Sequence, residues 1–181
     1  NLALTLDCGQ AFRWREEDGV WRGAAYGKSA AVEQSGDALL FYGSSADEVK
    51  NIWVRYFDLE RDYKSVLESF SEDLRVGNAI KSSGTVRILN QEPWEAFCSF
   101  IISQCNNIPR IKGIINTLCK SFGEELPDGS FTFPSAQTLA EKTEEELSVL
   151  RAGYRAPYIL AAAKAVASGE LDLDALMSSP L

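Results

Sequence analysis

Two short polar segments carry the side chains of this sequence that could do chemistry. Asn106, Asn107 and Arg110 follow a long apolar stretch, and residues 153–155, Gly-Tyr-Arg, separate two helix-like stretches. Amides offer both donors and acceptors, and a guanidinium offers a planar fork of donors. Such groups in a tight turn suit a ligand rich in donors and acceptors, such as nucleic acid. The alternative is that the asparagines only cap helices.

Two amphipathic helices are expected on either side of the paired amides. Pro93 suits the first turn of a helix, where its missing N–H costs nothing. The first helix is then expected to bury an apolar stripe made of Trp94, Phe97, Cys98, Ile101, Ile102 and Cys105. Pro109 opens the second helix and Gly123 ends it. Its stripe consists of Ile111, Ile114, Ile115, Leu118, Cys119 and Phe122.

The first part of the chain is expected to form a small antiparallel sheet, over residues 1 to about 43. The alternation typical of strands occurs at Leu2, Leu4, Leu6, Phe12 and Trp14. Turn clusters around Gly19, Gly27 and Gly36 separate the later strands. Ser44 or Ser45 then caps one helix, and a second helix runs from about Tyr63 to Phe70. A sheet with helices on one face gives an α+β fold.

The best domain boundary is the polar segment of residues 81–84. It divides a sheet-plus-helix domain, residues 1–84, from a helical domain, residues 85–181. In the second domain, helix starts are expected at Ser135, at the capping box of Thr143 and Glu146, and at Pro157.

Composition limits the classes of function. The chain has 181 residues, 45% of them hydrophobic, a net charge of -8 and a pI near 4.7. This acidity excludes a nonspecific nucleic-acid coat, although a local positive face remains possible. Between Val86 and Lys120, two acids oppose four basic residues, Arg87, Arg110, Lys112 and Lys120. No apolar run reaches membrane-spanning length. Because the chain lacks an initial methionine, we expect a piece of a longer protein.

The cysteines and the absence of histidine limit the chemistry further. Cys8, Cys98, Cys105 and Cys119 form no CxxC pair, so we expect small buried hydrophobic residues. A disulfide from Cys98 or Cys105 to Cys119 is the alternative. With no histidine, neither a zinc site nor a Ser–His or Cys–His nucleophile is expected. We predict no metal and no cofactor.

Four segments together resemble the 8-oxoguanine DNA glycosylases of the helix-hairpin-helix superfamily. They are residues 8–15, 91–95, 106–110 and 153–156, and they span almost the whole chain. The resemblance implies an N-terminal twisted antiparallel sheet with helices on one face, the TATA-binding-protein-like half. An all-helical glycosylase domain follows, incomplete here because it stops before the helix-hairpin-helix motif. The resemblance also implies that the damaged base is flipped out of the duplex.

The resemblance assigns lesion recognition to Gly9 and Phe12. Guanine presents an acceptor at N7, whereas the oxidised base carries a hydrogen there, so the carbonyl of Gly9 would attract the lesion and repel guanine. From the residues alone, a glycine between two strands is more often a bulge or a bend.

The resemblance also assigns DNA binding to Asn106, Asn107, Arg110, Tyr154 and Arg155. Tyr154 would be a wedge that fills the gap left by the extruded base. The other four would lie near the cytosine opposite the lesion. Without the resemblance, Tyr154 would be a half-buried packing residue. Cys105 stands where the animal enzymes have the first of three asparagines, so strict selection for cytosine is not implied.

No catalytic residue is expected in this sequence. Family members use a lysine from a Gly-rich hairpin, which forms a Schiff base, and a later aspartate. Neither motif occurs in these 181 residues, and Lys164 is expected to be solvated. This part is therefore expected to be inactive by itself.

The parent protein is expected to be a bifunctional DNA glycosylase and AP lyase of base excision repair. Its expected partner is double-stranded DNA containing oxidised guanine, with no membrane partner, and it would act as a monomer in the nucleus, or in the cytoplasm and nucleoid of a bacterium. Two alternatives remain: a glycosylase for alkylated bases and a noncatalytic damaged-DNA-binding module.

Overall fold

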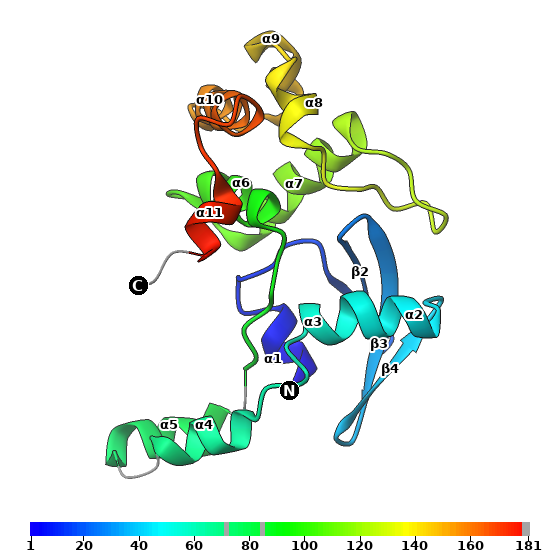
Figure 1. Cartoon of the computed structure of the whole chain (residues 1–181), viewed down its shortest axis with the longest axis vertical. Coiled ribbons are helices and arrows are strands. Elements are labelled where there is room, and N and C mark those ends of the chain that lie inside the picture. The colour runs from blue at the N-terminus through cyan, green and yellow to red at the C-terminus, as the bar shows by residue number, and fades with distance from the viewer. Residues whose placement is uncertain (71–72, 84–85, 179–181) are drawn as a thin grey trace. The chain divides into compact units, whose positions relative to one another are not determined.

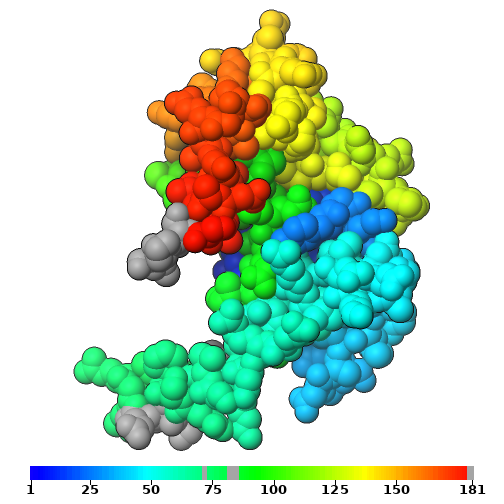
Figure 2. Space-filling model, viewed as in Figure 1, coloured from blue at the N-terminus to red at the C-terminus, as the bar shows by residue number. Residues whose placement is uncertain are grey.

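The computed structural model describes residues 1–70, 73–83 and 86–178, which Figures 1 and 2 colour from blue to red along the chain. The chain divides into two compact units. The first contains Asn1–Arg22 and Ala30–Asn90, and the second contains Gly23–Ser29 and Gln91–Leu181. The predicted boundary between residues 84 and 85 lies outside the described residues. Within the described ranges, no helix has the length and apolar character needed to cross a bilayer.

A four-stranded sheet follows a short helix at the start of the chain (Figure 1). The helix is α1, Leu2–Leu6, and the strands are β1, Arg15–Glu17, β2, Val20–Ala25, β3, Lys28–Ser35, and β4, Ala38–Tyr42. Their order is β1-β2-β3-β4, with β1 antiparallel to β2 and β3 antiparallel to β4. The predicted α+β class is confirmed.

The strand predicted at Leu2, Leu4 and Leu6 is wrong, because these residues form helix α1. The Asn1 side chain caps α1 by accepting the backbone N–H of Leu4 at 3.1 Å. Leu2, Thr5 and Leu6 are buried, whereas Leu4 is 40% exposed. Burial therefore follows the i, i+3, i+4 spacing of a helix rather than alternation.

Helices complete the first unit. The helix predicted after Ser44 or Ser45 is continuous, through α2, Ala46–Glu48, the π-helix η1, Val49–Trp53, and α3, Val54–Tyr56. Ser45 is the cap, one of the two serines predicted, and it forms a reciprocal capping box with Glu48. Next come α4, Tyr63–Ser69, and α5, Leu74–Ser83. The rings of Trp53, Tyr56 and Phe57 contact Trp14, whose indole N–H donates to the Tyr56 hydroxyl at 2.8 Å, and Phe41 extends this aromatic core by packing on Trp53 and Phe57.

The second unit is mainly helical. Its elements are α6, Pro93–Ser103, α7, Ile108–Phe122, α8, Ala136–Ala140, α9, Glu144–Leu147, the 3-10 helix η2, Ser148–Leu150, α10, Arg155–Ala167, and α11, Leu173–Ser178. The predicted caps at Ser135 and Thr143 are confirmed. The alanine-rich helix begins two residues before Pro157, at Arg155.

The stripe predicted for α7 is correct, whereas the stripe predicted for α6 is correct only at Cys98 and Ile102. In α7 the predicted residues are buried from Ile111 to Cys119. Helix α6 buries Cys98 and Ile102 as predicted, but its other buried residues are Glu95 and Ser99, which were not predicted. Phe97 and Ile101 are only half-buried, and Phe100 is 62% exposed. Because nearly every position of α6 is apolar, its pattern could not select the face that packs.

The cysteines also differ from the prediction. All four are free, but only Cys98 and Cys119 are buried, whereas Cys8 and Cys105 are exposed. Cys8 lies in the turn after α1, and Cys105 follows the end of α6. Both therefore stand outside the helical stripes that would have buried them.

Candidate nucleic-acid interface

The turn between α6 and α7 is built by the two asparagines. The Asn106 amide donates from Nδ2 to the Ile102 carbonyl at 3.0 Å and accepts the Asn107 N–H at 3.0 Å. Asn107 accepts the Arg110 N–H at 3.1 Å and so caps α7. Asn106 is half-buried and Asn107 is exposed. Capping is confirmed for Asn107, which is exposed, whereas the Asn106 side chain bonds a carbonyl near the end of α6.

Cys105 occupies the strained position of this turn. Its φ is +49°, in the left-handed region that a residue with a Cβ enters at a cost. Asparagine tolerates this region better than most residues, because its short amide can bond locally. Cys105 therefore stands at a position whose backbone conformation favours asparagine.

Arg155 holds this turn against the start of α10. The side chain is buried, with 4% exposed. Its Nε donates to the Gln104 carbonyl at 2.9 Å, and its Nη2 donates to the carbonyls of Gln104 and, at 3.0 Å, Cys105. Nη1 donates to the Ala152 carbonyl at 3.2 Å. The guanidinium therefore braces the loop backbone here, and its contact with cytosine stays a prediction.

Arg110 adds a second link between the same two segments. Its Nη2 donates to the Arg151 carbonyl at 3.2 Å. Arg151 has a φ of +50°, just before the turn that starts α10. Unlike Arg155, Arg110 is exposed, so its remaining donors face solvent.

Tyr154 presents an exposed aromatic ring. It is 57% exposed, so the half-buried packing alternative is wrong. The Arg155 guanidinium carbon lies 4.5 Å from the centre of the Tyr154 ring, and the Tyr158 ring meets it edge-on, with centroids 6.5 Å apart. The Tyr154 hydroxyl donates to the Gln104 carbonyl at 3.3 Å. These contacts orient the ring while its surface stays available for stacking.

The structure thus brings together five of the predicted residues in the second unit, Asn106, Asn107, Arg110, Tyr154 and Arg155. The other two, Gly9 and Phe12, lie in the first unit and are both half-buried. Gly9 has a φ of +88° and lies in a bend between α1 and β1, so of the two alternatives the bend is correct and the strand bulge is wrong. A left-handed φ accounts for glycine at this position.

Gln104 and Tyr158 also belong to this cluster but were not predicted from the sequence. Gln104 contributes its backbone carbonyl to both Arg155 and Tyr154, and a backbone group leaves no mark in the sequence. Tyr158 could have been identified, because residues four apart on a helix lie side by side.

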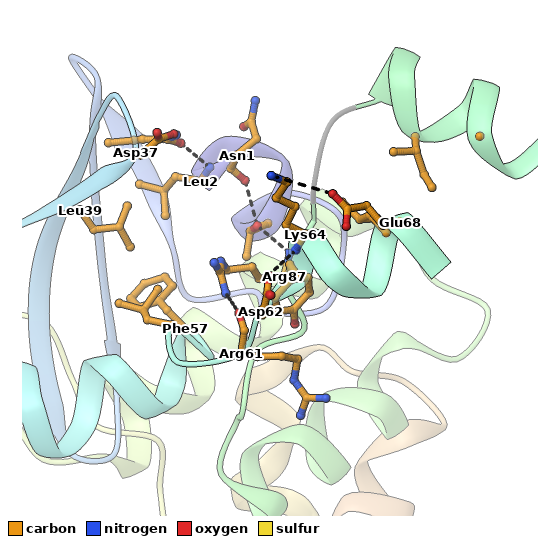
Figure 3. Close-up of a pocket in the computed structure, with 17 residues that line it drawn as sticks. Asn1, Leu2, Asp37, Leu39, Phe57, Arg61, Asp62, Lys64, Glu68 and Arg87 are labelled. Atoms are coloured by element: carbon orange, nitrogen blue, oxygen red, sulfur yellow. Dashed lines mark hydrogen bonds and ion pairs between the residues drawn. The ribbon is translucent and has the colours of Figure 1, made fainter. Parts of the chain in front are cut away.

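The first unit has a separate pocket of about 670 Å³ (Figure 3). Apolar side chains of Leu39 and Phe57 line it together with charges of both signs. Lys64 pairs with Glu68 at 3.9 Å, and the Arg87 guanidinium donates to the Asp58 carbonyl at 2.6 Å. Because its charges are mixed, this pocket offers no concentrated positive surface for phosphate. It contains none of the predicted site residues.

Comparisons with known proteins identify related chains. Residues 1–97 match the family described as 8-oxoguanine DNA glycosylase, N-terminal domain. The N-glycosylase/DNA lyase of Saccharomyces cerevisiae is 32% identical over 182 residues, covering 90% of this chain and 48% of that protein. The chain therefore spans about half the length of this relative.

Two solved structures share the fold of nearly the whole chain. MBOgg1, in complex with a low-affinity DNA ligand, is 41% identical with a TM-score of 0.95, covering 99% of this chain and 64% of that one. The Clostridium acetobutylicum 8-oxoguanine glycosylase/lyase, in complex with double-stranded DNA containing cytosine opposite 8-oxoguanine, is 37% identical with a TM-score of 0.93, covering 99% and 63%. The family match extends over more than half of the residues, so the chain belongs to the 8-oxoguanine DNA glycosylase family.

Proposed function

We propose that this chain is the N-terminal part of a bifunctional DNA glycosylase and AP lyase that excises 8-oxoguanine during base excision repair. The observation that carries the proposal is the cluster of exposed Tyr154, Asn107 and Arg110 around one braced turn, in a member of this family. The Clostridium relative was solved with 8-oxoguanine opposite cytosine, which supports duplex DNA with oxidised guanine as the partner here.

Tyr154 is proposed to be the wedge at the flipped base. An exposed ring backed by a guanidinium offers a stacking surface that loses little conformational entropy on binding. Asn107 and Arg110 would then approach the cytosine, whose pairing groups need replacement partners. Arg155 would support them by holding the turn, and Asn106 would cap it.

Gly9 is proposed to read the lesion through its carbonyl, with Phe12 lining the same site. The left-handed turn at Gly9 and its lack of a side chain allow a base to approach the backbone closely. A hydrogen at N7 of the oxidised base would meet this acceptor favourably, whereas the lone pair of guanine would be repelled.

Catalysis is proposed to come from the rest of the protein. The chain spans 48% of its yeast relative, so the lysine that forms the Schiff base and the aspartate would belong to the remainder. Lys164 is exposed on α10, which fits a solvated side chain. We propose that the whole protein acts as a monomer on nuclear or nucleoid DNA.

Borohydride trapping tests this function. The whole protein, mixed with a duplex containing 8-oxoguanine opposite cytosine, should give a covalent adduct after reduction, and the 181-residue chain should give none. A duplex with an alkylated base tests the first alternative in parallel. An adduct with the 181-residue chain, or excision of the alkylated base only, would contradict the proposal.

A further inference from the structure

We infer that Gln10 is a positioning residue for the lesion-reading carbonyl of Gly9, and that it thereby contributes to discrimination between oxidised and normal guanine. The inference rests on the proposed function of Gly9. It concerns a residue that would not touch the base and would act through the peptide that joins it to Gly9.

The side-chain amide of Gln10 ties three backbone segments of the first unit together. Its Nε2 donates to the Thr5 carbonyl in α1 at 2.9 Å and to the Arg87 carbonyl at 2.8 Å. Its Oε1 accepts the Leu89 N–H at 3.0 Å. These partners lie 5, 77 and 79 residues away in sequence, so one side chain connects the turn after α1 with the segment that leaves α5.

Thr5 closes the same network and is itself 2% exposed. Its hydroxyl donates to the Asn1 carbonyl at 2.8 Å and accepts the Arg87 N–H at 3.1 Å; Asn1 and Arg87 are both labelled in Figure 3. The Cys8 thiol also donates to the Thr5 carbonyl, at 3.4 Å. Gly9 therefore stands between two residues whose side chains are both anchored to α1.

Peptide geometry transmits this anchoring to the carbonyl. The carbonyl of Gly9 and the N and Cα atoms of Gln10 share one planar peptide unit. Glycine itself restrains this unit weakly, because it occupies positive and negative φ about equally well. A carbonyl that distinguishes a hydrogen from a lone pair must keep its direction, since a hydrogen bond weakens steeply as its angle departs from linearity. Gln10 supplies the restraint that Gly9 lacks.

The amide is the group that this position requires. It donates two hydrogen bonds and accepts one, in agreement with two carbonyls and one N–H. A carboxylate of the same shape would still accept from Leu89 but would place a negative oxygen against two carbonyls. Because Gln10 is only half-buried, a side chain that replaces it stays partly hydrated, so folding should survive.

Excision kinetics of the whole protein test this role. Gln10→Glu and Gln10→Met are each compared with wild type on duplexes with 8-oxoguanine or guanine opposite cytosine. We expect the ratio of kcat/KM for the lesion to that for guanine to fall by about tenfold in both variants, the size of effect expected when an oriented hydrogen-bond network is lost. Thermal melting of each variant shows how much protein is folded at the assay temperature.

Gln34 provides a matched control. Its amide also connects α1 with another segment, accepting from the Leu2 N–H at 2.8 Å and donating to the Gly36 carbonyl at 2.9 Å. Gln34→Glu and Gln34→Met should lower stability without changing the ratio. A Gln10 variant that is folded and keeps the wild-type ratio would overturn the inference. A wild-type protein that does not excise 8-oxoguanine would instead refute the proposed function, and with it the role of Gln10.

Discussion

Replacing Arg155 by methionine removes the brace of the interface turn while nearly preserving its volume. The guanidinium makes charged hydrogen bonds to the carbonyls of Gln104, Cys105 and Ala152. Bonds of this kind contribute about 1.5–3 kcal/mol each and are not additive. Two effects reduce the loss. Water can reach the exposed Gln104 and Cys105, and removal of a cation from the first turn of α10 recovers about 0.3–1 kcal/mol of unfavourable dipole interaction.

The expected net loss of unfolding free energy is about 2–3 kcal/mol. For a chain of this length, each kcal/mol lowers the melting temperature by roughly 2–4 °C, so Arg155→Met should melt roughly 4–12 °C below wild type. Circular dichroism at 222 nm measures this transition. Hydrogen exchange of the amides of residues 105–107 should accelerate, because the turn loses its tether.

Arg110→Met is the matched control for this prediction. Arg110 is exposed and donates to the Arg151 carbonyl at 3.2 Å. Its replacement should change the unfolding free energy by no more than about 0.5 kcal/mol, as is usual for surface substitutions. The control should melt within about 2 °C of wild type. If Arg155→Met did so as well, the buried guanidinium would not be what holds the turn.

Three further predictions concern single residues. Cys105→Asn should retain or slightly raise the free energy of unfolding. Cys105→Val should lower it by about 1–2 kcal/mol in urea unfolding, because a β-branched residue resists the φ of +49°. Equal stabilities of the two variants would refute the claim that the backbone at Cys105 is strained. The hydrogen bond from the Thr143 backbone N–H lowers the pKa of Glu146. The stability that the Glu146 carboxylate contributes as a cap is therefore present above its ordinary pKa of 4.5 and is lost as the pH falls through the lowered pKa. Glu146→Gln should therefore flatten the loss of stability in acid, and an unchanged pH profile would argue against the cap. Burial raises the pKa of the Cys98 thiol strongly, so a thiol reagent at neutral pH should modify the exposed Cys8 and Cys105 rapidly and the buried Cys98 and Cys119 only on unfolding; rapid reaction of all four would contradict this.

Interactions within four residues could be predicted from the sequence. Ser45, Asn107, Ser135 and Thr143 each cap a helix through an N–H three residues ahead, so residue type and spacing were sufficient. The α7 stripe was predicted because polar residues on the opposite side of α7 define its face. The three leucines of α1 fitted a strand as well as a helix, so the local pattern did not select the secondary structure. The apolar residues of α6 surround the helix, so the local pattern did not select the face that packs.

The same distinction applies to the candidate site. The sequence by itself identified the residues of the turn, its caps and its family motifs, since these are local features. Tertiary structure decided that Arg155 is buried and braces the turn, that Tyr154 is exposed, and that Gln10 ties Thr5 to Arg87. The acceptors of Arg155 in the turn are backbone carbonyls about 50 residues away in sequence. Every residue has such a carbonyl, so only the folded chain determines which of them meets a given side chain.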